Sequence, residues 1–359
     1  MSDDVYYRLA KVLDTLPSGF PATDDGLEIK ILKKVFQPEQ AELFCDLRLE
    51  YETPEQIAQR TGRPLEGLED MLSGMWDDGQ VMGIDFGTVK VFKMLPWVFG
   101  IFEFQVSRLD KELAELTEKY MPVFGPQFFK IKPQLMQVIP VEREITAIQE
   151  ALPYERVSSI IESGQSFAVN DCICKKEKGL LDHPCSRPME VCLAIAPVPG
   201  VFDDGRYGRP INKEEAYAIL NMAEEAGLVH LTWNSAGDRY FICNCCSCCC
   251  NVLLGINSLG ILEAVNSHYC AEIDPDLCVA CGLCADERCQ VRAIEEAEDL
   301  YRVIPERCIG CGLCVSTCPS QAIRLVRKSS DRISTPPKDQ SEWFEVRGRT
   351  RGVDFSQFK

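Results

Sequence analysis

Apolar residues recur with a helical period in the first part of the chain and predict a series of short helices. The predicted helices cover residues 4–16, 38–49, 53–61 and 64–76. Thr53 is a suitable N-cap for the third of them, and Pro54 fits its first turn. The pattern then changes and predicts a hairpin over residues 81–94, with its turn at residues 85–87.

The order of these elements over residues 31–95 resembles a winged-helix module, which contains the helix-turn-helix arrangement of many DNA-binding domains. A helix that enters a DNA groove needs cationic and amide side chains. The helix at residues 64–76, the third of this module, and the residues after it instead carry the carboxylates of Glu66, Glu69, Asp70, Asp77 and Asp78, against Arg63 alone. The sequence therefore favours a structural or protein-docking role for this module, with DNA recognition as the alternative.

The whole pattern predicts an α+β, multidomain chain. The predicted parts are an N-terminal helix and loop at residues 1–30, the winged-helix-like module at 31–95, an aromatic and helical connector at 96–165, a cysteine-rich α+β middle domain at 166–270, a second cysteine-rich domain at 271–327 and a flexible tail at 328–359. The tail is predicted from its mixed charge and its turn residues.

Within the connector, a helix is predicted at residues 109–120, and the prolines that follow are expected to interrupt the chain. The middle domain has a helix that starts near Asn212 and ends at Gly227. Two strands follow, at residues 228–233 and 238–242. The second strand leads directly into the densest group of cysteines.

The chain has 359 residues, a formal net charge of −17 and a sequence pI near 4.8. A nucleic acid is therefore not expected as the main partner, because phosphates are bound through clustered Lys and Arg. The 20 cysteines cluster as metal ligands do, and the first residues lack a signal-peptide pattern. Both features favour a reducing cytoplasm over a secreted disulfide scaffold. The most apolar stretch, residues 91–106, is too short and too interrupted by polar residues to predict a membrane span.

Two runs of cysteines near the C-terminus share the spacing CxxCxxC followed by a further cysteine; they are CVACGLCADERC from Cys278 and CIGCGLCVSTC from Cys308. A cubane iron–sulfur cluster needs four thiolates, and a CxxCxxC loop supplies three of them. In a two-cluster arrangement the last cysteine of each run binds the cluster of the other run. The pattern therefore assigns Cys278, Cys281, Cys284 and Cys318 to one [4Fe–4S] cluster, and Cys308, Cys311, Cys314 and Cys289 to a second.

The repeat extends beyond the cysteines, since Gly282-Leu283 matches Gly312-Leu313 and Ala293-Ile294 matches Ala322-Ile323. On these motifs, residues 271–327 resemble a bacterial-type ferredoxin domain with two [4Fe–4S] clusters. The first run departs from the family, because four residues rather than three separate Cys284 from Cys289 and no proline follows. Cys289 is therefore the ligand that the pattern fixes least. Zinc bound by two CxxC pairs is the alternative, but it leaves the third cysteine of each run unexplained.

The middle domain begins with four cysteines, Cys172, Cys174, Cys185 and Cys192. They are candidates for a third iron–sulfur cluster, with structural zinc as the alternative. A dense run follows, Cys243, Cys245, Cys246, Cys248, Cys249 and Cys250. Neighbouring side chains in an extended segment point in opposite directions, so this run implies at least two environments. We expect some of its thiols to complete the third cluster, some to bind a further cluster with Cys270, and some to stay unligated.

The leading interpretation is a cytoplasmic protein or subunit that transfers single electrons through [4Fe–4S] clusters to or from a redox enzyme partner. The middle domain resembles an extension found before two-cluster ferredoxin domains in anaerobic electron-transfer proteins. Three or more clusters, with about twelve iron atoms or more, are expected. The acidic charge fits a partner with a basic docking patch.

Two alternatives remain for the function. The first is an iron–sulfur reductase with an unusual cluster in the cysteine-rich domain, although no GxGxxG, P-loop or HExxH motif accompanies it. The second is an iron–sulfur transcriptional sensor that reads DNA through the winged-helix module, against which the acidic third helix argues.

Overall fold

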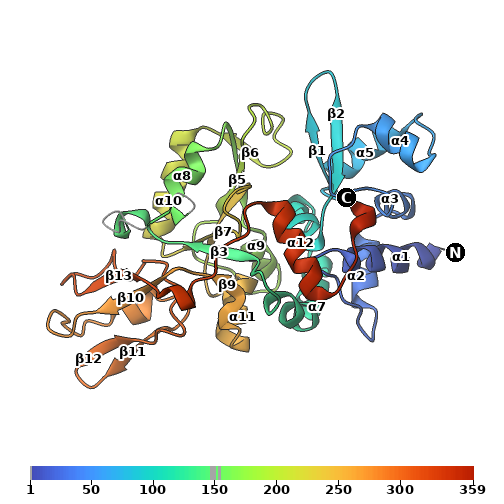
Figure 1. Cartoon of the computed structure of the whole chain (residues 1–359). Coiled ribbons are helices and arrows are strands. Elements are labelled where there is room, and N and C mark those ends of the chain that lie inside the picture. Colours follow the sequence, from blue (N-terminus) through green and yellow to red (C-terminus); the bar gives the residue numbers. More distant parts are fainter. Residues whose placement is uncertain (1, 146–150, 153–154) are drawn as a thin grey trace. The chain divides into compact units, whose positions relative to one another are not determined.

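The computed structural model describes residues 2–145, 151–152 and 155–359. The chain forms two compact units, the first with Met1–Ile131, Lys176–Pro184 and Phe344–Lys359, the second with Lys132–Lys175 and Cys185–Trp343. Helices and several sheets are present, so the predicted α+β, multidomain class is confirmed (Figure 1). In the part of the chain that the structure describes, no helix has both the length and the apolar character needed to cross a membrane.

Short helices and one hairpin form most of the first unit. They are α1 (Ser2–Thr15), α2 (Leu27–Val35), α3 (Pro38–Phe44), α4 (Pro54–Thr61), α5 (Leu68–Asp77), β1 (Val81–Asp85), β2 (Lys90–Met94) and the short α6 (Phe102–Phe104). The side chain of Thr53 accepts a hydrogen bond from the backbone N–H of Gln56 at 3.3 Å, which confirms the predicted cap of α4. Helices and hairpin follow one another in the predicted order, and the resemblance to a winged-helix module stays a prediction.

Helix α7 (Lys111–Phe129) is longer than the sequence predicts, because it runs through Pro122 and Pro126. Each proline costs a helix one backbone hydrogen bond and crowds the preceding turn. Along the buried face, neighbouring rings stack with centroids 5.8 and 4.6 Å apart, in the order Tyr120, Phe124 and Phe128. This aromatic packing stabilises the helix past the two prolines.

The prediction of a flexible tail over residues 328–359 is wrong, since the segment contains helix α12 (Gln340–Arg351) with buried side chains. Trp343 belongs to the second unit and packs on Trp233, with ring centroids 4.8 Å apart. Arg347 belongs to the first unit, where its guanidinium donates to the carbonyls of Pro17, Phe128 and Ile131. The composition suggested disorder, but these two large side chains meet partners that are distant in the sequence.

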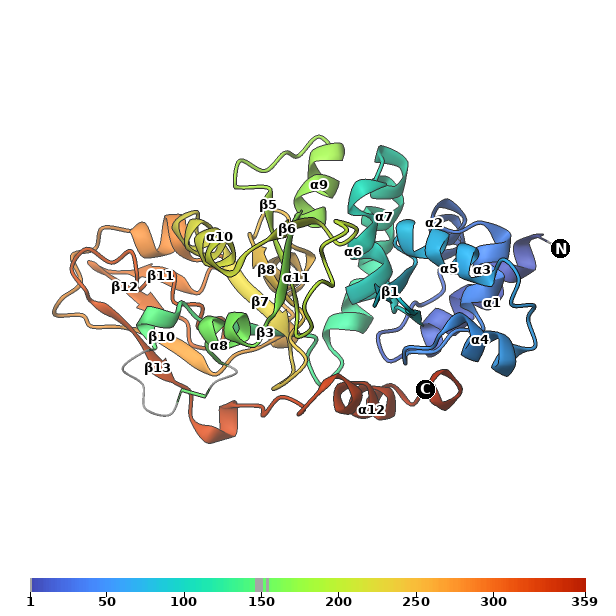
Figure 2. The same ribbon diagram turned by 90° about the horizontal axis from the view of Figure 1, so that it is seen from above.

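A sheet of seven strands forms the centre of the second unit, in the order β6-β4-β5-β8-β7-β3-β9 (Figures 1 and 2). Its strands are β3 (Met136–Ile139), β4 (Ser166–Asp171), β5 (Glu190–Ala196), β6 (Arg209–Ile211), β7 (Val229–Trp233), β8 (Phe241–Cys245) and β9 (Val265–Asn266). Neighbouring strands are antiparallel except β3 and β9, which are parallel. The hairpin of β7 and β8 is the one predicted to lead into the dense cysteine run.

The helices α8 (Val157–Glu162), α9 (Ile173–Leu180), α10 (Lys213–Glu225) and α11 (Asn251–Leu259) lie between these strands in the sequence. The start of α10 is as predicted, since the Asn212 side chain accepts a hydrogen bond from the backbone N–H of Glu215 at 2.8 Å. Gly227 follows the helix in a left-handed conformation, with φ of 71°.

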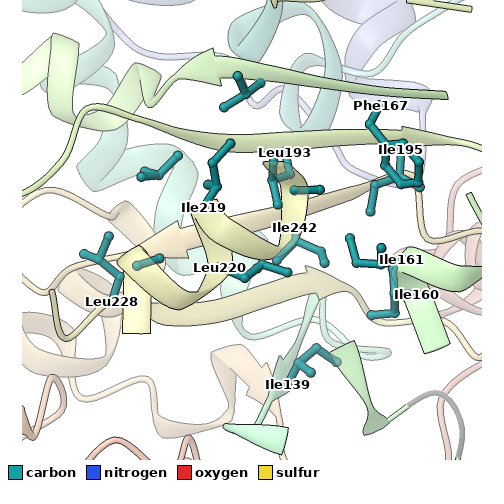
Figure 3. Close-up of a cluster of buried hydrophobic side chains, with 14 of the residues drawn as sticks. Ile139, Ile160, Ile161, Phe167, Leu193, Ile195, Ile219, Leu220, Leu228 and Ile242 are labelled. Atoms are coloured by element: carbon teal, nitrogen blue, oxygen red, sulfur yellow. The ribbon is translucent and has the colours of Figure 1, made fainter. Parts of the chain in front are cut away.

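Figure 3 shows the apolar core between α8, α10 and the sheet. Ile219 and Leu220 of α10 lie in one buried cluster with Leu193 of β5 and Ile242 of β8. Leu193 and Ile242 are paired across the two strands. Because successive residues of a strand face opposite sides, their neighbours Cys192 and Cys243 face away from this core. The core thus directs these two cysteines to one side of the sheet.

The C-terminal cysteine runs lie between two small antiparallel ladders. Strand β10 (Tyr269–Ile273) pairs with β13 (Ile323–Arg327), and β11 (Ile294–Ala297) pairs with β12 (Leu300–Val303). The first ladder joins the two ends of the predicted ferredoxin domain. The second ladder connects the two cysteine runs.

A buried carboxylate anchors the first ladder. Glu155 is 1% exposed and accepts hydrogen bonds from His268 Nδ1 at 2.5 Å, Tyr269 Oη at 2.7 Å and Arg327 at 2.9 Å. Burial alone raises the pKa of this carboxyl, but the donors, His268 and Arg327 foremost, lower it to about 2. The charge therefore stabilises the fold above the ordinary glutamate pKa of 4.5, and this stabilisation is lost as the pH falls toward 2.

We expect Glu155→Gln to speed the loss of absorbance from the predicted iron–sulfur clusters in urea at pH 7, by at least about tenfold, because breaking a buried ion pair costs about 3–5 kcal/mol. The measurement is visible absorbance under anaerobic conditions. The control is Glu272→Gln on β10, whose pair with Arg324 at 3.0 Å is exposed and contributes about 0–1 kcal/mol. Equal rates for the two variants would contradict the anchoring role.

Candidate metal centres

The four cysteines of the first predicted cluster line one cavity. Cys278, Cys281, Cys284 and Cys318 surround it, together with Tyr301 and apolar side chains. Three of the thiols come from the loop between β10 and β11, and Cys318 comes from the second run. The structure therefore brings together the set that the spacing predicts.

A second cavity is lined by the other predicted set, Cys289, Cys308, Cys311 and Cys314. Burial raises the pKa of Cys311 to about 12, and burial also raises that of Cys314 well above its usual range. Apolar surroundings do not stabilise the negative charge of a thiolate, so a bound cation is needed to keep such thiols deprotonated. The donor set and the cavity therefore fit a group of iron ions.

The longer first run is accommodated by a π-helical turn over Cys284–Arg288. Such a turn contains one residue more than the usual helical turn. The extra residue between Cys284 and Cys289 is absorbed there, and Cys289 still lines the second cavity. The altered spacing therefore does not remove Cys289 from the predicted set.

The two runs also repeat the same backbone conformation. Ala280 and Gly310 have φ of 51° and 62°, and Gly282 and Gly312 have φ of 77° and 82°. At Gly310 a side chain has no space, since a Cβ would lie 2.1 Å from the carbonyl oxygen of Tyr269. The sequence repeat is thus a repeat of left-handed turns, which glycine adopts most readily.

Backbone N–H groups donate to the cysteine sulfurs at equivalent places of the repeat. Ala293 N–H donates to Cys289 Sγ at 3.0 Å, and Ala322 N–H donates to Cys318 Sγ at 3.3 Å. Burial raises the pKa of Cys318, but bonds from Ser320 and Ala322 outweigh it and lower that pKa. The matching Ala-Ile pairs of the sequence therefore mark positions whose amides stabilise negative charge on sulfur.

Cys270 lies beside the second cavity rather than beside the dense run. Its thiol donates a hydrogen bond to Cys308, which lowers the pKa of Cys308 to about 6. The sequence predicts a cluster shared by Cys270 and the dense run, and the structure groups Cys270 differently. The reason is that β10 pairs with β13 and so carries Cys270 into the ferredoxin-like segment.

Four other thiols form a compact tetrad, with all Sγ atoms within 4.8 Å of one another: Cys185, Cys246, Cys248 and Cys249. Cys185 lies in the loop before β5, and the other three lie in the turn between β8 and α11. Hydrogen bonds from the Cys249 and Cys248 thiols are the main reason that the pKa of Cys246 is lowered to about 5. We call this set the thiol tetrad.

The remaining middle cysteines form a connected six-thiol group, Cys172, Cys174, Cys192, Cys243, Cys245 and Cys250. Hydrogen bonds join Cys243 to Cys192 and to Cys245, and Cys245 to Cys250. Cys172 is hydrogen-bonded to Cys174, and the charge interaction of Cys172 with Cys243 links this pair to the other four. Bonds from Cys192 and Cys245 hold the pKa of Cys243 well below its usual range. The dense run is therefore divided between two environments, as the alternation of side chains predicts.

The predicted set Cys172, Cys174, Cys185 and Cys192 is not brought together as one group. Cys185 belongs to the thiol tetrad, and the other three belong to the six-thiol group. The cause is the long loop after α9, which carries Cys185 to the β8–α11 turn, a contact that spacing does not encode.

Sequence reasoning also missed Lys175, which follows Cys174 directly. Its side chain is buried, and its ammonium donates to the carbonyl of Pro188 at 2.5 Å. Its charge contributes to lowering the pKa of both Cys172 and Cys246. The sequence has no signal for this role, because a single lysine beside a cysteine is common.

Comparison with known proteins supports the C-terminal part of this description. Residues 271–325 match the family model of a 4Fe-4S dicluster domain. No curated protein and no solved structure matches the chain. The dicluster domain and the clustered cysteines of the middle domain support multiple iron–sulfur clusters and an electron-transfer role.

We expect the double variant Cys289→Ala/Cys270→Ala to lose about four iron and four sulfide atoms per chain, because one cubane would be left with three thiolates. Cys270→Ala is included so that the thiol beside Cys308 cannot substitute. Iron and acid-labile sulfide are measured after anaerobic purification. The matched control, Cys270→Ala alone, is expected to keep both clusters, and an equal metal content in the two variants would show that Cys289 is not a ligand.

Proposed function

We propose that this chain transfers single electrons through several iron–sulfur clusters to or from a redox enzyme partner. The observation that carries the proposal is the pair of four-thiol cavities within a matched dicluster domain. Each cavity draws its fourth cysteine from the other run. We propose that electrons pass between two clusters held in this way.

We assign Cys278, Cys281, Cys284 and Cys318 to the first cluster, and Cys289, Cys308, Cys311 and Cys314 to the second. When bound, a [4Fe–4S] cluster changes by one electron, and no acid or base residue is required. The chain sets the reduction potential through burial and through N–H donors to the sulfurs. None of the four thiols of the second cavity is exposed, whereas Cys281 of the first cavity is exposed, so the two cavities offer different surroundings.

The first cavity has the features of an exit to a partner. Cys281 is exposed, and its neighbours Leu277 and Val279 are 50% and 64% exposed. The exposed carboxylates around them are those of Asp274, Asp276, Asp286 and Glu287. Exposed apolar side chains with exposed carboxylates near them in the sequence fit a partner whose docking surface combines apolar and basic residues.

The second cavity is connected to the cysteine-rich region. Gln290, next to Cys289, accepts a hydrogen bond through its side chain from the backbone N–H of Ser247 at 2.9 Å. Ser247 lies between Cys246 and Cys248 of the thiol tetrad. We propose that this contact continues the electron path toward a third cluster in the six-thiol group, where six thiols exceed the four that a cubane needs.

The many thiols also favour a reducing compartment, since free thiols are oxidised to disulfides outside it. We therefore place the protein in the cytoplasm. The acidic charge of −17 fits docking on a basic partner rather than on a nucleic acid.

The test is iron and sulfide analysis of the anaerobically purified chain, combined with electron paramagnetic resonance after reduction by dithionite. About twelve iron and twelve sulfide atoms are expected, with a broadened spectrum from two interacting clusters. The reduced chain is then expected to return its electrons one at a time to an artificial one-electron acceptor.

Other results would change the assignment. About eight iron atoms would restrict the clusters to residues 271–325. Reduction of a small substrate by the chain alone would favour a reductase. Absence of magnetic interaction would contradict two neighbouring clusters in the dicluster domain.

A further inference from the structure

The structure assigns a second kind of metal site to this chain. We infer that Cys185, Cys246, Cys248 and Cys249 bind a single thiophilic divalent cation, Zn²⁺ or Fe²⁺, in a tetrahedral tetrathiolate site rather than a cubane. The inference concerns a site outside the dicluster domain, so it does not rest on the proposed function.

The sulfur–sulfur distances carry the argument. Four thiolates around one cation at about 2.3 Å form a tetrahedron with edges of roughly 3.8 Å. In the thiol tetrad, Cys185 Sγ lies 3.8 Å from Cys246 Sγ and 3.6 Å from Cys248 Sγ. Cys248 Sγ lies 3.3 Å from Cys246 Sγ and 3.6 Å from Cys249 Sγ. These edges match one central ion.

A cubane requires a wider arrangement. Each thiolate binds a different iron at a different corner, so the four ligand sulfurs are spread around the whole cluster and cannot all lie in contact with one another. The dicluster domain gives a comparison inside the same chain. Among the described residues, no three cysteines of either dicluster cavity lie within 4.8 Å of one another, whereas all four of the thiol tetrad do.

The chain holds the thiol tetrad in place from several sides. The turn that carries three of the thiols is closed by the backbone bond from Cys250 N–H to the carbonyl of Cys246 at 3.0 Å. Gln290 fixes the middle of this turn through Ser247. The loop that carries Cys185 is fixed by Arg187, which donates to the carbonyls of Ala226 and Gly227 at 3.0 and 2.7 Å.

The surroundings also suit a closed structural site. Cys246 and Cys249 are buried, and the exposed Cys248 closes the site toward solvent. Four thiolates and one divalent cation have a net charge of −2, and the buried ammonium of Lys175 lies close enough to act on Cys246. A cation bound by these four thiolates joins the Cys185 loop to the β8–α11 turn. Any cluster of the middle domain is then bound by the six-thiol group.

The first test uses the wild-type chain, purified anaerobically. Cubanes contain equal numbers of iron and sulfide, so a single-ion site appears as one metal atom per chain in excess of sulfide. One zinc atom identifies Zn²⁺, and one excess iron atom identifies Fe²⁺. X-ray absorption at the edge of that metal is expected to show four sulfur neighbours at about 2.3 Å and no second metal.

The second test is Cys248→Ala. It is expected to lose that one metal atom and no sulfide, while Cys45→Ala, a buried thiol of the first unit, changes neither. A loss of about four iron and four sulfide atoms in Cys248→Ala would overturn the inference in favour of a cubane. Equal metal and sulfide in the wild-type chain would overturn it as well, whether or not the variant folds.

Discussion

A thiolate that is shielded from water needs a positive charge or a hydrogen-bond donor close to its sulfur, and the second unit is arranged around this need. Amides of Ala293 and Ala322 donate to cysteine sulfurs, and Lys175 brings an ammonium group to the middle cysteines. The central sheet and the core beneath α10 support the middle cysteines (Figure 3). Burial raises the pKa of thiols such as Cys311, so without bound cations their neutral form would be the stable one.

The predictions from the sequence succeeded where a site is built from one short segment. A CxxCxxC loop brings its three thiols around one centre, so the two dicluster sets follow from spacing and from the crossing of the last cysteines. The π-helical turn accommodates the extra residue between Cys284 and Cys289. A helix start such as that of α4 is likewise local, since Thr53 needs only the amide of Gln56.

The spacing along the sequence could not predict which middle cysteines lie together, because tertiary contacts determine their neighbours. Cys185 meets Cys246 across 61 residues, and Cys270 meets Cys308 through the pairing of β10 with β13. The prediction of a flexible tail was wrong for the same reason. Trp343 and Arg347 look like isolated residues in a polar segment, yet each finds its partners more than a hundred residues away.

The hydrogen bond between Gln290 and Ser247 has a consequence for maturation of the protein. It ties a residue next to a dicluster ligand to the turn that presents three thiols of the tetrad. Ordering of either segment by its metal therefore lowers the entropy lost when the other is ordered, and this coupling is reciprocal. We therefore expect a chain that lacks one centre to fill the other more slowly during biogenesis, although the other centre still fills.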